Sequence, residues 1–111
     1  MTVSEHTPQE LPIACDLNAI PAAERDTHGA RAQRLLCQDA AEVRELPDGY
    51  ALRYSADVYE EVTRFIGTER RCCPFFTFAL EVSPQQGPIW LRITGPAEAK
   101  TILQTALGHG S

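Results

Sequence analysis

The chain has 111 residues, of which 43% are hydrophobic and 23% are charged, and its net charge is −5. This length suits one domain with a real core and is too short for two. The net negative charge excludes a surface that mainly binds nucleic acid, because binding to phosphates needs clustered lysine and arginine. The sequence shows neither a membrane-length apolar run of roughly 20 residues nor a signal-peptide pattern, so we expect a cytoplasmic location.

The first part of the chain predicts a tail, a strand and a helix. Residues 1–10 are polar and aperiodic, as is typical of a flexible N-terminal tail. Apolar residues alternate over 11–17, which predicts a short strand with Cys15 on its inward side. A helix is expected over 21–38, because Pro21 suits a first helical turn.

The rest of the chain predicts two hairpins and two further helices. Residues 47–49, Pro-Asp-Gly, are typical of a turn between two strands. Ser55 can cap a second helix, which Pro74 ends. A second hairpin follows over 76–94, and a last helix is expected to stop at Gly108.

The predicted order is therefore strand, helix, hairpin, helix, hairpin, helix. This order predicts a single α+β domain over residues 11–108, with three helices on one face of a mostly antiparallel sheet. The sheet would contain both hairpins and the N-terminal strand, in an order that the pattern leaves open.

The four cysteines, Cys15, Cys37, Cys72 and Cys73, include one adjacent pair and no CxxC motif. In a reducing cytoplasm we expect free thiols and not a disulfide framework. Neighbouring side chains diverge by about 100° on a regular helix. Because Pro74 ends the helix, Cys73 is free to turn toward its neighbour.

We therefore expect Cys15, Cys72 and Cys73 to converge on one ion. Three thiolates without histidine select soft ions such as Cu(I), Hg(II) or As(III), and could also hold zinc. Cys37 could add a fourth sulfur, but it fits ordinary packing equally well. A cysteine taken alone is most often a small buried hydrophobe, so the adjacent pair is what favours a function.

Glu69 extends the buried stripe of the second helix and lies one turn before Cys73. A carboxylate there could orient a ligand or act as an acid or base. Alternatively, it is half-exposed and paired with Arg64 or Arg70. None of the three histidines is a ligand candidate, since His28 lies on a charged helix and the others in expected tails.

The segment "FIGTERRCCPFFTFALEV…GPIWLRITGP" resembles a family of small uncharacterised bacterial proteins with an E-R-x-C-C-P-F block. Relatives stand alone or form domains of metal-responsive, mercury-regulator-type transcription factors, and often carry an earlier cysteine in a C-x-L setting. The resemblance covers roughly residues 12–107. It singles out Cys15, Glu69, Cys72 and Cys73. The chain shows no helix-turn-helix segment, so the resemblance does not imply a regulator's DNA-binding role.

The leading interpretation is a cytoplasmic protein that binds a soft metal or metalloid ion for resistance, buffering or sensing, with Arg70 or Arg71 near the ligands. One alternative is a thiol enzyme, redox or organometal-cleaving, that uses the adjacent cysteines Cys72 and Cys73, one of them as nucleophile, and Glu69 as proton donor. Another is an interaction or sensing domain whose cysteines only pack. The expected partner is a metal ion, a protein partner or homodimer stays open, and neither nucleic acid nor membrane is expected.

Overall fold

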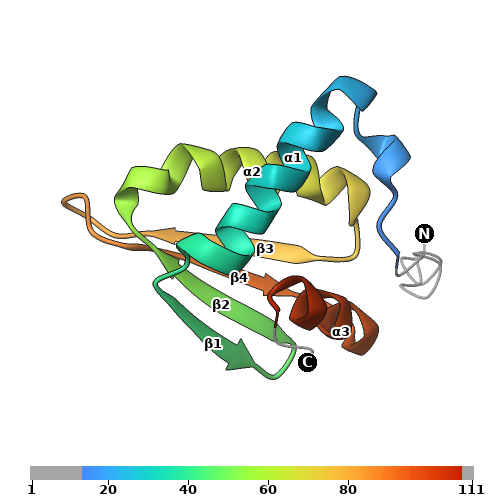
Figure 1. The fold of residues 1–111 in the computed structure, drawn as a ribbon. Helices are drawn as coiled ribbons and strands as arrows, with labels where there is room; N and C mark the ends of the chain where they lie inside the picture. Colours follow the sequence, from blue (N-terminus) through green and yellow to red (C-terminus); the bar gives the residue numbers. More distant parts are fainter. Residues whose placement is uncertain (1–13, 109–111) are drawn as a thin grey trace, which may run out of the picture.

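The computed structural model describes residues 14–108, so the predicted tail and the start of the predicted strand lie outside this range. Three helices pack against a four-stranded antiparallel sheet (Figure 1), which confirms the predicted α+β class. The helices are α1 (Ala22–Arg34), α2 (Tyr59–Cys72) and α3 (Ala97–Ala106), and the strands are β1 (Glu42–Leu46), β2 (Gly49–Tyr54), β3 (Thr77–Val82) and β4 (Ile89–Thr94). No helix within the described range is both long and apolar enough to cross a membrane.

The sheet has the order β1-β2-β4-β3, with every neighbouring pair antiparallel. Strand β2 of the first predicted hairpin therefore pairs with β4 of the second, and these two strands form the centre of the sheet. Leu52 lies opposite Leu91, and Leu91 lies opposite Leu80, so one apolar row crosses three strands. Gly49 begins β2 where the backbone of Ile93 is so close that any Cβ would collide with it.

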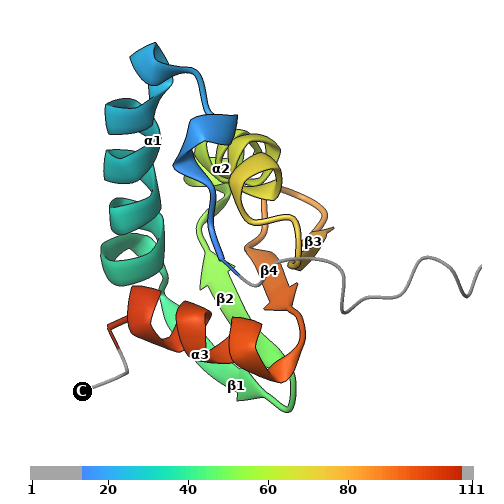
Figure 2. The same cartoon turned by 90° about the vertical axis from the view of Figure 1, so that its right-hand side faces the viewer.

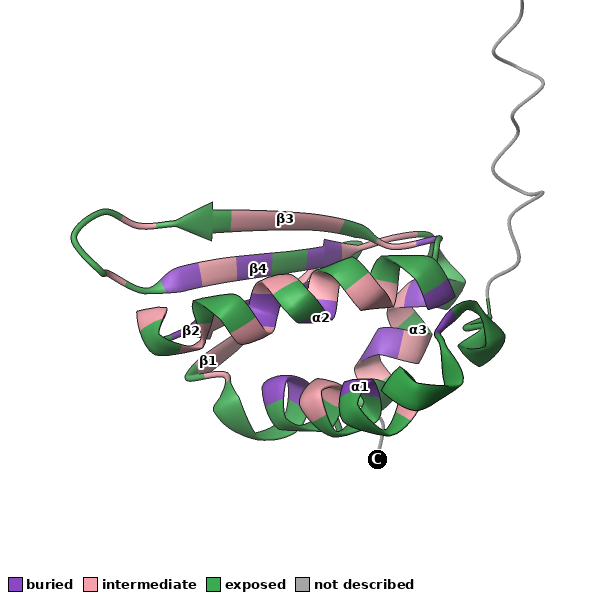
Figure 3. Ribbon diagram, turned by 90° about the horizontal axis from the view of Figure 1, so that it is seen from above, coloured by how far each residue is buried: buried purple, intermediate pink, exposed green. Residues whose placement is uncertain are grey.

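The core lies between one face of this sheet and the helices. Residues along β4 alternate between buried and more exposed positions, as Figure 3 shows. The strand residues that face the helices are Tyr50, Leu52, Tyr54, Ile89, Leu91 and Ile93. Val62 and Phe65 of α2 and Leu103 of α3 pack into the same cluster. Burial of these side chains supplies the main driving force for the fold.

The predicted helix over 21–38 corresponds to α1 and a π-helical turn, Leu35–Asp39, that continues it. Tyr54 is fully buried beneath this turn, and its hydroxyl donates a hydrogen bond to the Leu35 carbonyl at 2.8 Å. Burial raises the pKa of Tyr54 well above its usual value, so the hydroxyl stays protonated. One hydrogen bond thus ties the end of α1 to the central strand β2.

The predicted N-terminal strand is wrong for the residues that the structure describes. Leu17–Ala19 forms a 3-10 turn, and the Asp16 side chain caps it by accepting from the Asn18 backbone N–H at 3.0 Å. The Asp16 backbone N–H donates to the Cys72 carbonyl at 2.7 Å, so this segment lies against the end of α2 (Figure 2). Cys15 is exposed in this segment and is not part of a strand.

We predict that Tyr54→Phe lowers the free energy of unfolding by about 1–2 kcal/mol, because the buried Leu35 carbonyl loses its side-chain partner. Urea unfolding measures the difference. The matched control is Tyr59→Phe, since Tyr59 is exposed. Equal stability of the two variants would show that the buried hydrogen bond contributes nothing.

Candidate functional site

The site begins where α2 ends. The helix runs to Cys72, and Cys73 has φ −126° and ψ 72°, outside the helical region. This change follows from Pro74, which disfavours helical backbone at the preceding residue. It brings the Sγ atoms of Cys72 and Cys73 to 3.6 Å from each other, where both side chains are buried. The two adjacent sulfurs therefore share one space, as the sequence predicted.

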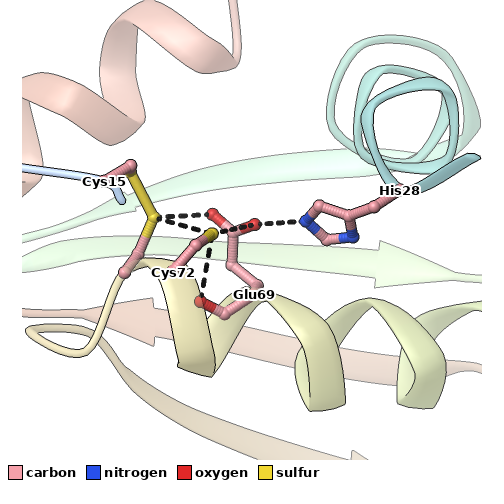
Figure 4. Close-up of polar contacts among 5 residues, drawn as sticks. Cys15, His28, Glu69 and Cys72 are labelled. Carbon is pink, nitrogen blue, oxygen red and sulfur yellow. Dashed lines mark hydrogen bonds and ion pairs between the residues drawn. A yellow bond between two sulfur atoms is a disulfide. The ribbon is translucent and has the colours of Figure 1, made fainter. Parts of the chain in front are cut away.

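Cys15 forms a disulfide with Cys73, with their Cα atoms 4.6 Å apart (Figure 4). This corrects the expectation of four free thiols, since among the described residues only Cys37 and Cys72 are free. That expectation rested on an assumed reducing compartment, whereas the fold brings Cys15 within bonding distance of Cys73. The structure does place Cys15 beside the adjacent pair, although it lies on an exposed turn and not on a strand.

Glu69 lies at the centre of the group, and its side chain is only 16% exposed. One carboxylate oxygen, Oε2, is 3.2 Å from the Cys73 sulfur. The other, Oε1, is 3.7 Å from the Cys72 sulfur and accepts a hydrogen bond from His28 Nε2 at 2.8 Å. Figure 4 shows the carboxylate between the sulfurs and the imidazole.

His28 is the site residue that sequence reasoning missed. It lies on α1, is 5% exposed, and stacks on the Phe65 ring with centroids 5.8 Å apart. Its other ring nitrogen, Nδ1, is buried and has no hydrogen-bond partner. The signal was present, because His28 and Ala32 of α1 and Leu35 of the following π-helical turn recur at helical spacing and face inward.

The arginines of α2 contribute less to this site than the sequence predicted. Arg70 and Arg71 are exposed in the last turn of the helix. Glu69 forms its ion pair with His28, and not with Arg64 or Arg70. No arginine therefore neutralises the carboxylate at the sulfurs.

The Cys72 thiol is held in its protonated form. Burial raises its pKa to about 12, and the negative charge of Glu69 and the hydrogen bond that the thiol donates to it act in the same direction. In this oxidised form Cys72 is therefore a weak nucleophile at neutral pH.

Two sets of side chains have their ligand atoms within 4.8 Å of one another and could hold a metal ion. Both include Glu69: the first set is Cys15, Glu69 and Cys73, and the second is His28, Glu69 and Cys72. Cys37 belongs to neither set, because it is exposed and its sulfur donates to the Ala106 carbonyl at 3.2 Å. Of the four cysteines, three therefore meet at one place.

Comparisons of the chain with protein-family models, curated proteins and solved structures return no match. The resemblance to metal-linked bacterial proteins stays a prediction. Inference about function accordingly depends on the geometry of this site.

We predict that Cys15→Ser lowers the free energy of unfolding by about 2–4 kcal/mol, because the Cys15–Cys73 bond closes a loop between residues 58 apart in sequence. Urea unfolding without reductant measures the loss. Adding a reductant should lower the wild-type stability to that of the variant, and Cys37→Ser serves as the control cysteine. Equal stability of wild type and Cys15→Ser without reductant would contradict the disulfide.

We predict that iodoacetamide at pH 8 alkylates exposed Cys37 and leaves Cys72 unmodified, because the raised pKa of Cys72 keeps its thiol protonated. Glu69→Gln removes a negative charge beside the thiol, so the onset of Cys72 alkylation should move to lower pH. Mass spectrometry of the modified peptides between pH 7 and 10 measures the alkylation rates of Cys37 and Cys72 in each protein. The control is Glu60→Gln on the exposed side of α2, and a Cys72 as reactive as Cys37 at pH 8 would refute the prediction.

Proposed function

We propose that this protein binds one soft metal or metalloid ion through the thiolates of Cys15, Cys72 and Cys73, once the Cys15–Cys73 disulfide is reduced. The observation that carries the proposal is the convergence of three sulfurs and one carboxylate from two distant segments of the chain. Packing alone needs no such group, since free cysteine normally packs singly as a small hydrophobe.

Reduction supplies two electrons and two protons and converts the disulfide to two thiols. An incoming ion then replaces the thiol protons, because only the thiolate is a ligand. Glu69 is placed to accept such a proton, with oxygens 3.2 Å from the Cys73 sulfur and 3.7 Å from the Cys72 sulfur. Thiolates select soft ions such as Cu(I), and Hg(II) and As(III) share this preference.

The three ligands differ in exposure, and this difference suggests a route for the ion. Cys15 is exposed, whereas Cys72 and Cys73 are buried. An ion carried by a small thiol in solution would meet Cys15 first and then pass to the buried pair by ligand exchange. Such transfer suits buffering, resistance or sensing, in which an ion is captured and later released.

The thiol-enzyme alternative has one observation in its favour, the hydrogen bond between Glu69 and His28, which could serve an acid–base role. Cys72, one of the two cysteines this alternative could use, is a poor nucleophile. A cysteine enzyme activates its thiol by lowering the pKa, and burial and Glu69 raise that of Cys72. Ion binding accommodates the raised pKa, because a soft ion displaces the proton directly.

We predict that the reduced protein binds Hg(II) or Cu(I) at one ion per chain, with an ultraviolet thiolate-to-metal band that saturates at that ratio. Cys72→Ser combined with Cys73→Ser should weaken binding by more than about 100-fold, which is the upper end of effects seen for residues that only support ligands. Cys37→Ser, the matched control outside the group, should bind like the wild type. The titration is followed by absorbance with a competing chelator.

The oxidised protein provides a second comparison, because Cys15 and Cys73 are then bonded to each other. Its affinity for the same ion should fall and return when a reductant is added. Absence of a stoichiometric band in the reduced protein, or an unchanged band in the double variant, would refute the proposed function.

A further inference from the structure

A small, mostly apolar cavity of about 90 Å³ lies beside Cys15. It lies between α2, α3 and the sheet and is partly open to solvent, and its apolar lining includes Phe65, Phe76, Phe78, Ile93, Ile102 and Leu103. Its polar lining residues are Cys15 and Glu69, both of which belong to the first metal-ligand set. One wall of the cavity therefore carries Cys15, the sulfur partner of Cys73, together with Glu69, and the remaining walls are hydrocarbon.

A bare ion would use only the wall that carries Cys15 and Glu69. Water in the remaining space would find few hydrogen-bond partners beyond that wall, whereas an apolar group would replace it favourably. A ligand with a soft ion at one end and a hydrocarbon group at the other would satisfy both parts of the cavity.

We infer that the site binds a soft metal or metalloid ion that carries one small alkyl group, with the ion on the thiolates and the alkyl group in the apolar cavity. This inference rests on the proposed function. A thiol of the site replaces a labile anionic ligand on the ion, such as hydroxide or a small thiolate, and the departing ligand takes up the thiol proton and leaves as water or a small thiol. The carbon–metal bond stays intact, and nothing is oxidised or reduced.

The size of the cavity limits the alkyl group. An apolar cavity of about 150 Å³ accommodates benzene, so 90 Å³ suits a methyl or ethyl group and excludes a phenyl group. Each additional buried CH₂ should strengthen binding by about fourfold until the space is full.

The test measures affinities of the full, reduced protein for Hg(II), methylmercury, ethylmercury and phenylmercury, each in competition with free cysteine. Competition with cysteine cancels the intrinsic strength of the sulfur–mercury bond. We expect the protein to prefer ethylmercury over methylmercury by about fourfold relative to cysteine, and to disfavour phenylmercury.

Ile102 allows the cavity to be changed without replacing a ligand residue, because it lies half-buried on α3 among the lining residues. Ile102→Phe should fill the space, lower ethylmercury affinity by about tenfold and leave Hg(II) affinity unchanged. Ile102→Ala should enlarge the space and improve phenylmercury binding. The matched control is Ile66→Phe, since Ile66 is also half-buried but does not line the cavity.

The Hg(II) measurement separates the two proposals. If Hg(II) itself fails to bind the thiols, the proposed function is wrong. If Hg(II) binds but the organic series follows free cysteine, and Ile102→Phe behaves like Ile66→Phe, only the inference about the alkyl group is overturned.

Discussion

The whole site depends on where α2 ends. Because Pro74 disfavours helical backbone at Cys73, the chain turns there and directs the Cys73 sulfur toward Cys72 and Cys15. A helix one residue longer would separate the adjacent side chains by about 100°. The hydrogen bond from the Asp16 backbone to the Cys72 carbonyl holds the N-terminal segment against the same helix end. The turn at Cys73 and this hydrogen bond together bring the three sulfurs to one place.

The packing of α1 on α2 sets the charge at the sulfurs. His28 stacks on Phe65 and donates to Glu69, so the carboxylate cannot turn to solvent without leaving a second buried nitrogen of His28 unpaired. Without an ion, this carboxylate opposes formation of the Cys72 thiolate. With a cation on the sulfurs, the same negative charge becomes favourable. Under the proposed function, Glu69 therefore disfavours the Cys72 thiolate when no ion is bound and favours it when an ion is bound.

The alternation of apolar residues in strands and their helical spacing in helices predicted most of the fold, because both patterns are local properties of the chain. The stripe of α2 also led to Glu69 beside the cysteines. The order of the strands was not predictable, since the pairing of β2 with β4 depends on how whole sheet faces pack. His28 was discounted because its neighbours on α1 are charged. The strand around Cys15 was wrong because alternation over a few residues also occurs in a segment shaped by a cap and by tertiary contacts.

Under the proposed function, the disulfide and a bound ion would compete for the sulfurs of Cys15 and Cys73. With the bond closed, the remaining ligands are His28, Glu69 and Cys72, a mixed set of nitrogen, oxygen and sulfur that suits a borderline ion such as zinc. Opening the bond adds the thiolates of Cys15 and Cys73 and shifts the preference toward soft ions. Whether a disulfide stays closed depends on its potential relative to that of its compartment. Under the proposed function, the redox state of one bond therefore selects which class of ion the site prefers.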